Sequence, residues 1–336
     1  MRCFLSRIKV CFGAASIISL SIFAASCSEG ARLGEKGFVV PERLKLKSST
    51  APASRVVGEL KSGDQVTVTG HSSSEDGTPW SKVEGPGGES GWVESGYLVK
   101  QEVVEQSRKI ADEVKDVPTQ AIGKSKARLR LRLSPDRAND DNTATQLPSG
   151  TVLEIVARER KPRPATLDAG AEARQESNDP EVRYDDWYKV RLRGYTILPA
   201  GWIYGGSVEL DIPAEIVYFA SRGRKITGWQ KIGTVTGDDS KSGDHYLVLE
   251  RKTAGADEGV DFDRVKVLAY DPYSRNYSTP LREDVPGRFP VTVKMEGTRG
   301  QFHLIVIDKD KQRQKLVYEI EMLEGGKVNI TKPAMK

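Results

Sequence analysis

Along most of the chain, apolar and polar residues alternate over short runs, which is the spacing of a strand with one buried face. Examples are LKLK (44–47), QVTVT (65–69) and WSKVE (80–84). Glycine-bearing segments separate them, such as Ser62-Gly63-Asp64 and GPGGES (85–90). Short alternating runs joined by tight turns indicate small antiparallel β-structures rather than long helices.

The pattern is repeated. Residues 80–100 read WSKVEGPGGESGWVESGYLVK, and residues 187–210 read WYKVRLRGYTILPAGWIYGGSVEL. The offset is 85 between Leu44 and Leu129 but 107 between Trp80 and Trp187. An offset that grows only at gaps is typical of insertions into surface loops. The largest insertion, residues 161–186, is rich in Pro, Ala and charge, and we expect it to be mobile.

One further region lies between the repeats, and another follows them. Within residues 101–125, Val103, Ile110, Val114 and Val117 have helical spacing, which predicts a short amphipathic linker helix that ends before Pro118. Residues 212–336 are predicted to be antiparallel β-structure, either a barrel or a sandwich. The predicted strands are EIVYFAS, WQKIGTVT, DHYLVLER, DRVKVLAYD, FPVTVKME, QFHLIVID, QKLVYEIEM and GKVNITK.

Both repeats resemble bacterial Src-homology-3 (SH3) domains. The matching features are a Leu-x-Leu-Arg/Lys opening, Trp-x-Lys-Val, Gly-Trp-hydrophobic and an apolar close. The resemblance implies two small β-barrels, at 38–100 and 126–211, that bind ligands without transforming them. The family's Arg-Ser/Ala-Gly-Pro turn is replaced by residues 47–50 and 132–135, so ligand contacts near that loop do not carry over. The expected fold class is mainly β, with two SH3-like barrels joined by a short helix and followed by the antiparallel domain.

The N-terminus resembles a lipoprotein signal. Arg2, Arg7 and Lys9 precede an apolar run at 10–25, and small residues precede Cys27. We expect a signal at 1–26, lipidation of Cys27 and a tether at 27–37. Ala24 stands where such signals usually have Leu, and the alternative is an ordinary secretory signal cleaved near Ala25. Cys27 is the only cysteine outside the signal, which lipidation explains. The predicted location is the cell envelope, anchored to a membrane and either internal or surface-exposed.

Charge excludes one class of partner. The formal net charge is +4, and removing Arg2, Arg7 and Lys9 with the signal leaves +1. A nearly neutral chain has no overall field to attract nucleic acid, so none is expected as a partner. Arg128, Arg130 and Arg132 share one strand face and form a candidate basic stripe for an anionic polymer. A solvated outer face is the favoured interpretation of this stripe.

Aromatic residues are the other candidate ligand contacts. Tyr97, Tyr188 and Tyr204 follow the tryptophan landmarks and are candidates for an exposed platform or for strand packing. Trp80 and Trp187 begin strands, where core or cross-strand packing is favoured, and they remain candidate ligand contacts.

No set of residues suggests catalysis. His71, His245 and His303 lack metal-ligand spacing, and no nucleophile motif is present. We expect no metal, no cofactor and no enzymatic activity. The function predicted is that of a lipid-anchored envelope protein whose repeats bind peptidoglycan or an envelope protein, with avidity from the linked pair. The alternative is a surface adhesin for host proteins, or an uncharacterised activity carried by residues 212–336.

Overall fold

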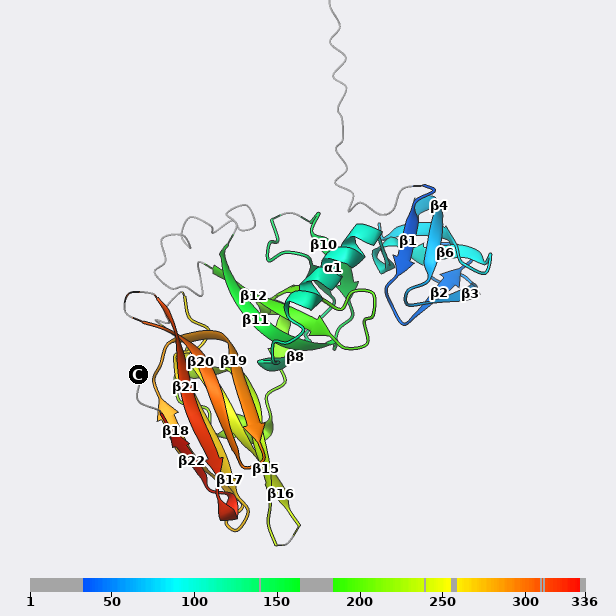
Figure 1. The fold of residues 1–336 in the computed structure, drawn as a ribbon. Helices are drawn as coiled ribbons and strands as arrows, with labels where there is room; N and C mark the ends of the chain where they lie inside the picture. Colours follow the sequence, from blue (N-terminus) through cyan, green and yellow to red (C-terminus); the bar gives the residue numbers. More distant parts are fainter. Residues whose placement is uncertain are drawn as a thin grey trace, which may run out of the picture.

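The computed structural model describes residues 33–138, 140–163, 184–238, 240–254, 259–308, 310 and 312–332, and these are mainly β. Figure 1 shows two small sheets, a helix beside them and a larger β domain formed by the last third of the chain. The mainly β fold class is therefore confirmed. The predicted signal, Cys27 and residues 164–183 of the predicted insertion lie outside the described residues.

The first sheet has seven antiparallel strands in the order β3-β2-β6-β5-β4-β1-β7. Its elements are β1 (Lys36–Val39), β2 (Arg43–Lys47), β3 (Val56–Lys61), β4 (Gln65–Ser73), β5 (Pro79–Glu84), β6 (Ser90–Glu94), η1 (Ser95–Tyr97) and β7 (Leu98–Val99). The predicted strands at 44–47, 65–69 and 80–84 are all present. β4 extends beyond the predicted run to Ser73.

The second sheet repeats this order strand for strand, as β10-β9-β13-β12-β11-β8-β14. Its elements are β8 (Ala121–Ser125), β9 (Leu129–Arg132), β10 (Thr143–Leu147), β11 (Val152–Pro162), β12 (Tyr184–Leu192), β13 (Ala200–Tyr204), η3 (Gly205–Ser207) and β14 (Val208–Leu210). We call residues 36–99 the first unit and residues 121–210 the second unit. Both ends of the predicted insertion at 161–186 lie within β11 and β12.

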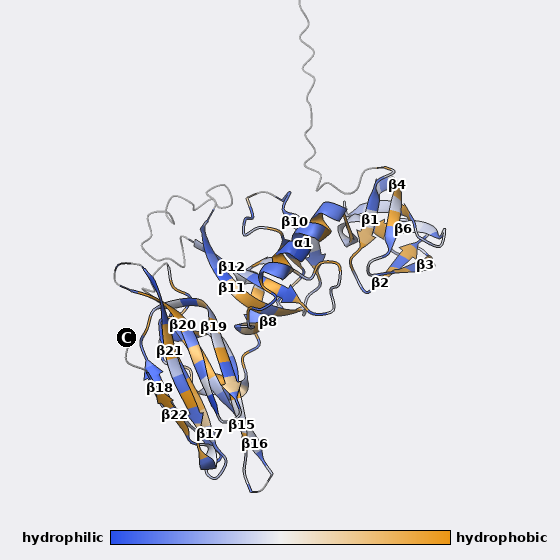
Figure 2. Cartoon of the chain, viewed as in Figure 1, coloured by the Kyte–Doolittle hydropathy of each residue, from blue (hydrophilic) through white to orange (hydrophobic). Residues whose placement is uncertain are grey.

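The two units bury matching positions. Leu46 and Leu60 in the first unit correspond in sequence to Leu131 and Leu147 in the second, and all four side chains are fully buried. In each unit, strands from opposite ends of the sheet contribute to one apolar cluster, so the sheet must curl around it. Figure 2 shows the corresponding alternation of apolar and polar residues along the strands.

The predicted linker helix is confirmed as α1 (Gln101–Glu113), which contacts β13 of the second unit. It buries Val104, Ser107 and Ile110, and the Ser107 hydroxyl donates to the Ala200 carbonyl at 2.6 Å. The linker was expected to run to residue 125. Residues 121–125 instead form β8, which pairs with β11 and β14, because alternating burial allows them to complete the second sheet.

The last third of the chain is a sandwich of two four-stranded antiparallel sheets, which resolves the open choice between barrel and sandwich. One sheet contains β15 (Arg224–Thr236), β16 (Ser242–Lys252), β17 (Arg264–Asp271) and β18 (Asn276–Glu283). The other contains β19 (Gly287–Glu296), β20 (Arg299–Ile307), β21 (Arg313–Met322) and β22 (Val328–Thr331), and η4 (Glu324–Gly326) precedes β22. Leu247, Val267, Phe302 and Tyr318 are among the buried residues between them.

Two elements of the sandwich differ from the prediction. EIVYFAS was expected to be a strand, but Ala214–Tyr218 forms a short helix, α4, after Pro213. Its apolar residues do not alternate in burial, since Ile216 is fully buried while Val217 and Tyr218 are exposed. β18 was not predicted. It contains Pro280 and lies at the edge of its sheet, where proline is tolerated and few side chains are buried.

Gln120 joins the second unit to the sandwich. Its side chain is fully buried, donates to the Val291 carbonyl at 3.0 Å and accepts from the Val291 amide at 2.7 Å. Its own amide donates to Ile155, and its carbonyl accepts from Trp229, each at 2.8 Å. One residue thus connects β11, β15 and β19. A buried amide with all these bonds made fixes the position of the strands around it.

Candidate functional site

The second unit has a groove beside β9, β12 and β13, with a volume of about 400 Å³. Its lining includes three basic residues of the predicted stripe, two of the predicted aromatic residues and a further arginine: Arg128, Arg130, Arg132, Trp187, Tyr204 and Arg137. We call this the second-unit groove. It brings together side chains that are about 75 residues apart in the sequence, from β9 to the end of β13.

Aromatic rings form one wall of the groove. Trp187 is 1% exposed and therefore contributes mainly to the core. Tyr204 meets Trp187 edge to face, with ring centroids 6.0 Å apart at an angle of 64°. The Arg137 guanidinium lies 4.6 Å from the centroid of the Tyr204 ring, within the range of a cation–π contact. Tyr204 is thus the aromatic side chain that remains partly accessible in the groove.

Acidic partners hold the groove arginines in place. Asp140 pairs with Arg130 at 2.8 Å and with Arg132 at 2.9 Å. Arg137 pairs with the buried carboxylate of Asp185 at 2.7 Å. The expected outer-face role is wrong for Arg132, whose side chain is only 6% exposed. Its position next to Asp140 in the β9–β10 hairpin supplies the ion pair that burial of a guanidinium requires.

Two of the predicted candidates lie elsewhere in the two repeated units. Trp80, which corresponds to Trp187, is 7% exposed; its indole N–H donates to the Ser74 hydroxyl at 3.2 Å. Tyr188 packs against the apolar cluster of the second unit, and burial raises the pKa of its phenol. Neither residue lines the second-unit groove.

Tyr97 lies at the border between the two units. It packs against the core of the first unit, and its hydroxyl accepts a hydrogen bond from Arg128 at 2.8 Å. Thr145 also crosses this border, donating to the Gly96 carbonyl at 3.0 Å. Arg128 therefore belongs to both the groove and the contact between units.

The sequence prediction missed four residues that shape the groove, namely Arg137, Asp140, Asn142 and Asp185. Asn142 accepts from Arg132 at 2.6 Å and donates to the Ser134 hydroxyl at 2.8 Å. A signal was present in SPDRANDDN (134–142), where acidic and amide residues directly follow the basic strand. Recognising that the hairpin folds back on its own strand would have pointed to Arg137, Asp140 and Asn142, but not to Asp185 of β12.

The histidines form no common site. His245 is 1% exposed, its Nδ1 accepts from the Tyr270 amide at 2.9 Å, and burial lowers its pKa. The pKa of His303 is lowered by burial and by Lys315. His71 is 3.5 Å from the Ser81 hydroxyl. Within the described part of the chain, no three His, Cys, Asp or Glu side chains are grouped so that they could hold a metal ion.

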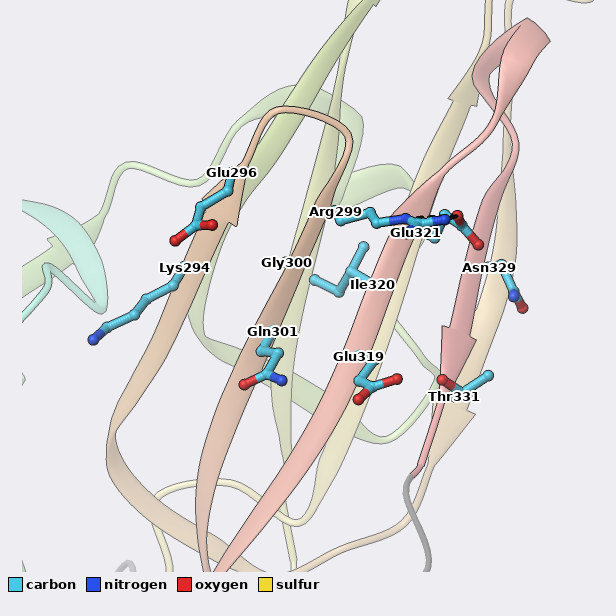
Figure 3. Close-up of a pocket in the computed structure, with 10 residues that line it drawn as sticks. All are labelled: Lys294, Glu296, Arg299, Gly300, Gln301, Glu319, Ile320, Glu321, Asn329 and Thr331. Atoms are coloured by element: carbon cyan, nitrogen blue, oxygen red, sulfur yellow. Dashed lines mark hydrogen bonds and ion pairs between the residues drawn. The ribbon is translucent and has the colours of Figure 1, made fainter.

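A second hollow, of about 740 Å³, lies on the outer face of the sheet formed by β19–β22 (Figure 3). Its lining mixes charges of both signs. Arg299 and Glu321 pair at 2.7 Å, while Figure 3 shows Lys294 and Glu296 projecting from the neighbouring strand.

The described residues include no helix long and apolar enough to span a membrane.

Comparisons with known proteins bear on the first unit. The model of the bacterial SH3 domain family matches residues 42–99, from β2 to β7, which supports the resemblance of the first repeat to this family. The comparison with curated proteins gave no match.

Several solved structures were also matched. Among the matches are NlpC2 and NlpC1 from Trichomonas vaginalis, with 16% and 14% sequence identity. The matches cover 52% and 54% of this chain but only 47% and 49% of those chains, each with a TM-score of 0.16. The match thus spans about half the length of those structures.

Proposed function

We propose that this chain is a binding protein of a bacterial cell envelope, without catalytic activity, and that its two units bind a cell-wall component or an envelope protein. The family match over residues 42–99 supports a ligand-binding role for the first unit. We extend that role to the second unit because its strand order is the same and its core positions correspond.

The second-unit groove is the observation that carries this proposal. It offers an aromatic edge at Tyr204 beside the guanidinium groups of Arg130 and Arg137. Arg130 and its partner Asp140 are each about half exposed, so a carboxylate or phosphate on a ligand can replace Asp140 at Arg130 while Asp140 keeps its pair with the buried Arg132. Such a groove suits an extended peptide or glycan that carries acidic groups.

The decisive test is retention on isolated peptidoglycan at moderate salt. Arg128→Glu/Arg130→Glu should lose binding at least tenfold if the groove is the site, since each reversal replaces attraction by repulsion. The matched control is Arg43→Glu/Lys45→Glu, because these exposed residues of β2 stand at the positions that correspond to Arg128 and Arg130 of the second unit. Equal retention of all variants would remove the groove from the proposal. No retention of the unmodified chain would refute the wall as partner and leave a protein.

Export and anchoring form a separate part of the proposal. The basic N-terminus, the apolar run at 10–25 and Cys27 support a lipidated, membrane-anchored protein. Mass spectrometry of the protein from membranes should find acyl chains on Cys27, and Cys27→Ser should release the protein to the soluble fraction. A free Cys27 thiol on a protein that is still exported would contradict lipidation and leave export intact.

A second candidate function is a surface adhesin that acts through the sandwich. The hollow on β19–β22 favours it, because it presents a wide face with charges of both signs that a protein partner could complement (Figure 3). Protease treatment of intact cells distinguishes the candidates, since only a protein that faces outward is cleaved. Protection from protease in intact cells would exclude the adhesin.

A further inference from the structure

A basic hollow in the sandwich is separate from both sites above. It has a volume of about 540 Å³ and lies between the turn that follows α4 and the strands β17 and β18. Its lining includes Phe219, Ser221, Arg222, Lys266, Thr279 and Arg282. We call it the α4 hollow.

A buried ion pair fixes the floor of the hollow. The Lys266 side chain is 5% exposed, and its ammonium donates to the Phe219 carbonyl at 2.6 Å and pairs with Glu250 at 2.7 Å. Glu250 is fully buried and also accepts from the Ser221 amide at 2.9 Å. The positive charge of Lys266 is therefore compensated. Its structural effect is to hold the turn at 219–221 against the sheet, so that the hollow is formed before any ligand arrives.

Two arginines at the rim are different. Arg222 comes from the turn and Arg282 from β18, where it pairs in register with Lys266. Both are exposed, and neither makes an ion pair or side-chain hydrogen bond with any described residue. The arginines of the second-unit groove, by contrast, already have carboxylate or phenol partners. The rim of the α4 hollow thus presents two guanidinium groups with all their donors available.

The surroundings add to the positive potential. Five cations surround three carboxylates here: Arg222, Arg224, Arg264, Lys266 and Arg282 around Glu250, Asp263 and Asp284. Burial lowers the pKa of the Arg224 guanidinium, and the nearby charges of Arg264 and Arg282 lower it further, against the opposing effect of Asp284 and Glu250. An uncompensated positive charge therefore remains on this face, and it attracts anions.

We propose that the α4 hollow binds a phosphate ester. Guanidinium groups that reach the hollow from two elements, together with the Thr279 hydroxyl, match the several oxygens and double charge of a phosphate better than a carboxylate, which one arginine already satisfies. The hollow is larger than a phosphate, and Phe219 supplies an apolar wall for the rest of the ester. This site does not depend on the SH3-like units and goes beyond the proposed function.

The test measures binding of glycerol 3-phosphate and inorganic phosphate to the full chain by titration calorimetry, with acetate at equal ionic strength for comparison. Arg222→Gln/Arg282→Gln should weaken phosphate binding at least about tenfold, because each lost charged contact is worth roughly that factor. The matched control is Arg313→Gln/Lys315→Gln, which removes the same charge from exposed positions on β21. The control should bind phosphate like the unmodified chain.

Three results would overturn the proposal: no saturable phosphate binding, equal loss in both double variants, or acetate binding as tight as phosphate. Since the altered side chains are exposed, an unchanged melting temperature would show that the variants are folded.

A second arm identifies the source of the phosphate. Vesicles of phosphatidylcholine with phosphatidylglycerol are compared with phosphatidylcholine alone, in the presence and absence of glycerol 3-phosphate. Vesicle binding that depends on Arg222 and Arg282 and is displaced by glycerol 3-phosphate supports a lipid headgroup. Binding of the free ester without any such vesicle binding supports a soluble or wall-borne phosphate ester.

Discussion

The two repeated units have the same strand order, yet they differ in how far their cores extend. The core of the first unit is a cluster of its own, formed by residues such as Val39, Leu46 and Val83. The core of the second unit continues into α1 and into one sheet of the sandwich, including Val104 and Val248, and of the buried residues of the first unit it includes only Val40 and Val99. A shared topology thus leaves the first unit as an attached module and makes the second unit part of a larger body.

The tryptophan landmarks show the same difference. Trp92 of the first unit is partly exposed, whereas its counterpart Trp202 is 9% exposed and belongs to a cluster with Ile110 of α1. Glu94 stands where the second unit has Tyr204, so the first unit lacks the aromatic edge of the groove. The surroundings of each copy, rather than its strand order, determine which surface is left for a ligand.

The largest expected effect comes from removing the buried tryptophan of the second unit. Trp187→Ala should destabilise it by about 3–5 kcal/mol, because the ring is almost fully buried and leaves a cavity. Urea unfolding followed by circular dichroism should show the second unit and the sandwich losing stability together. Trp80→Ala, the matched change, should leave that transition in place. A loss of similar size in the same transition for both variants would contradict the separation of the cores.

A smaller effect is expected at the junction with the sandwich. Gln120→Ala leaves the buried amide of Val291 without its side-chain partner, which costs about 1–3 kcal/mol, while the Val291 carbonyl still accepts from the Gln230 side chain at 2.6 Å. Hydrogen exchange at the Val291 amide should accelerate, and the second unit and sandwich should begin to unfold separately. Gln101→Ala, at an exposed position on α1, is the control. Unchanged exchange at Val291 would refute this role for Gln120.

The docking of α1 contributes less. Ser107→Ala removes the hydroxyl that donates to the Ala200 carbonyl and accepts from the Ala200 amide, so we expect a loss of about 1–2 kcal/mol. Ser107→Thr, if the added methyl is accommodated, should retain the hydrogen bonds. The comparison is measured as the shift in the urea midpoint of the second-unit transition. No difference between the Ala and Thr variants would show that apolar contacts alone hold the helix.

The smallest effect is a pH dependence specific to the second unit. Burial raises the pKa of Glu154, but hydrogen bonds and charges from Arg193 and Arg191 outweigh it and hold the pKa below its usual 4.5. Since the folded-state pKa is depressed, this stabilisation is present above pH 4.5 and is lost as the pH falls through the lowered value. Arg191 also donates to the Val114 carbonyl, so acid should loosen the end of α1.

Urea midpoints between pH 7 and pH 3 check this expectation. Glu154→Gln should make the second-unit transition less dependent on pH. Burial raises the pKa of Asp261, so Asp261 changes stability with pH in the opposite direction to Glu154. The effect of Glu154 is therefore isolated by comparing the single Glu154→Gln variant with the unmodified chain. An identical pH profile for the variant would contradict the assignment.

The sequence was sufficient where a local pattern determines structure. Alternation predicted the strands of the first unit, and helical spacing predicted α1. The sequence was not sufficient where a segment becomes a strand because of the strands with which it pairs. Apolar and polar residues alternate too weakly in β8 for the strand to be recognised without its partners β11 and β14. β18 tolerates Pro280 because one edge of this strand has no neighbouring strand to bond among the described residues.

The candidate site could be predicted only in part, for a related reason. Residue type identified the arginines of β9 and the aromatic residues of β12 and β13. Whether an arginine faces solvent or is buried depends on Asp140 and Asp185, which the chain brings back from outside the strand. Tyr188 and Tyr204 look alike in sequence, and only the placement of their strands separates a packed ring from an accessible one.

One feature common to both units has a practical consequence. The first strand of each sheet pairs with the last, as Phe38 does with Val99 and Ser125 with Val208. The polypeptide therefore enters and leaves each unit at neighbouring points. A further copy can therefore be inserted into the chain, or the first copy removed, without stretching the flanking segments. Gene duplication or engineering can in this way lengthen the protein by one whole unit at a time.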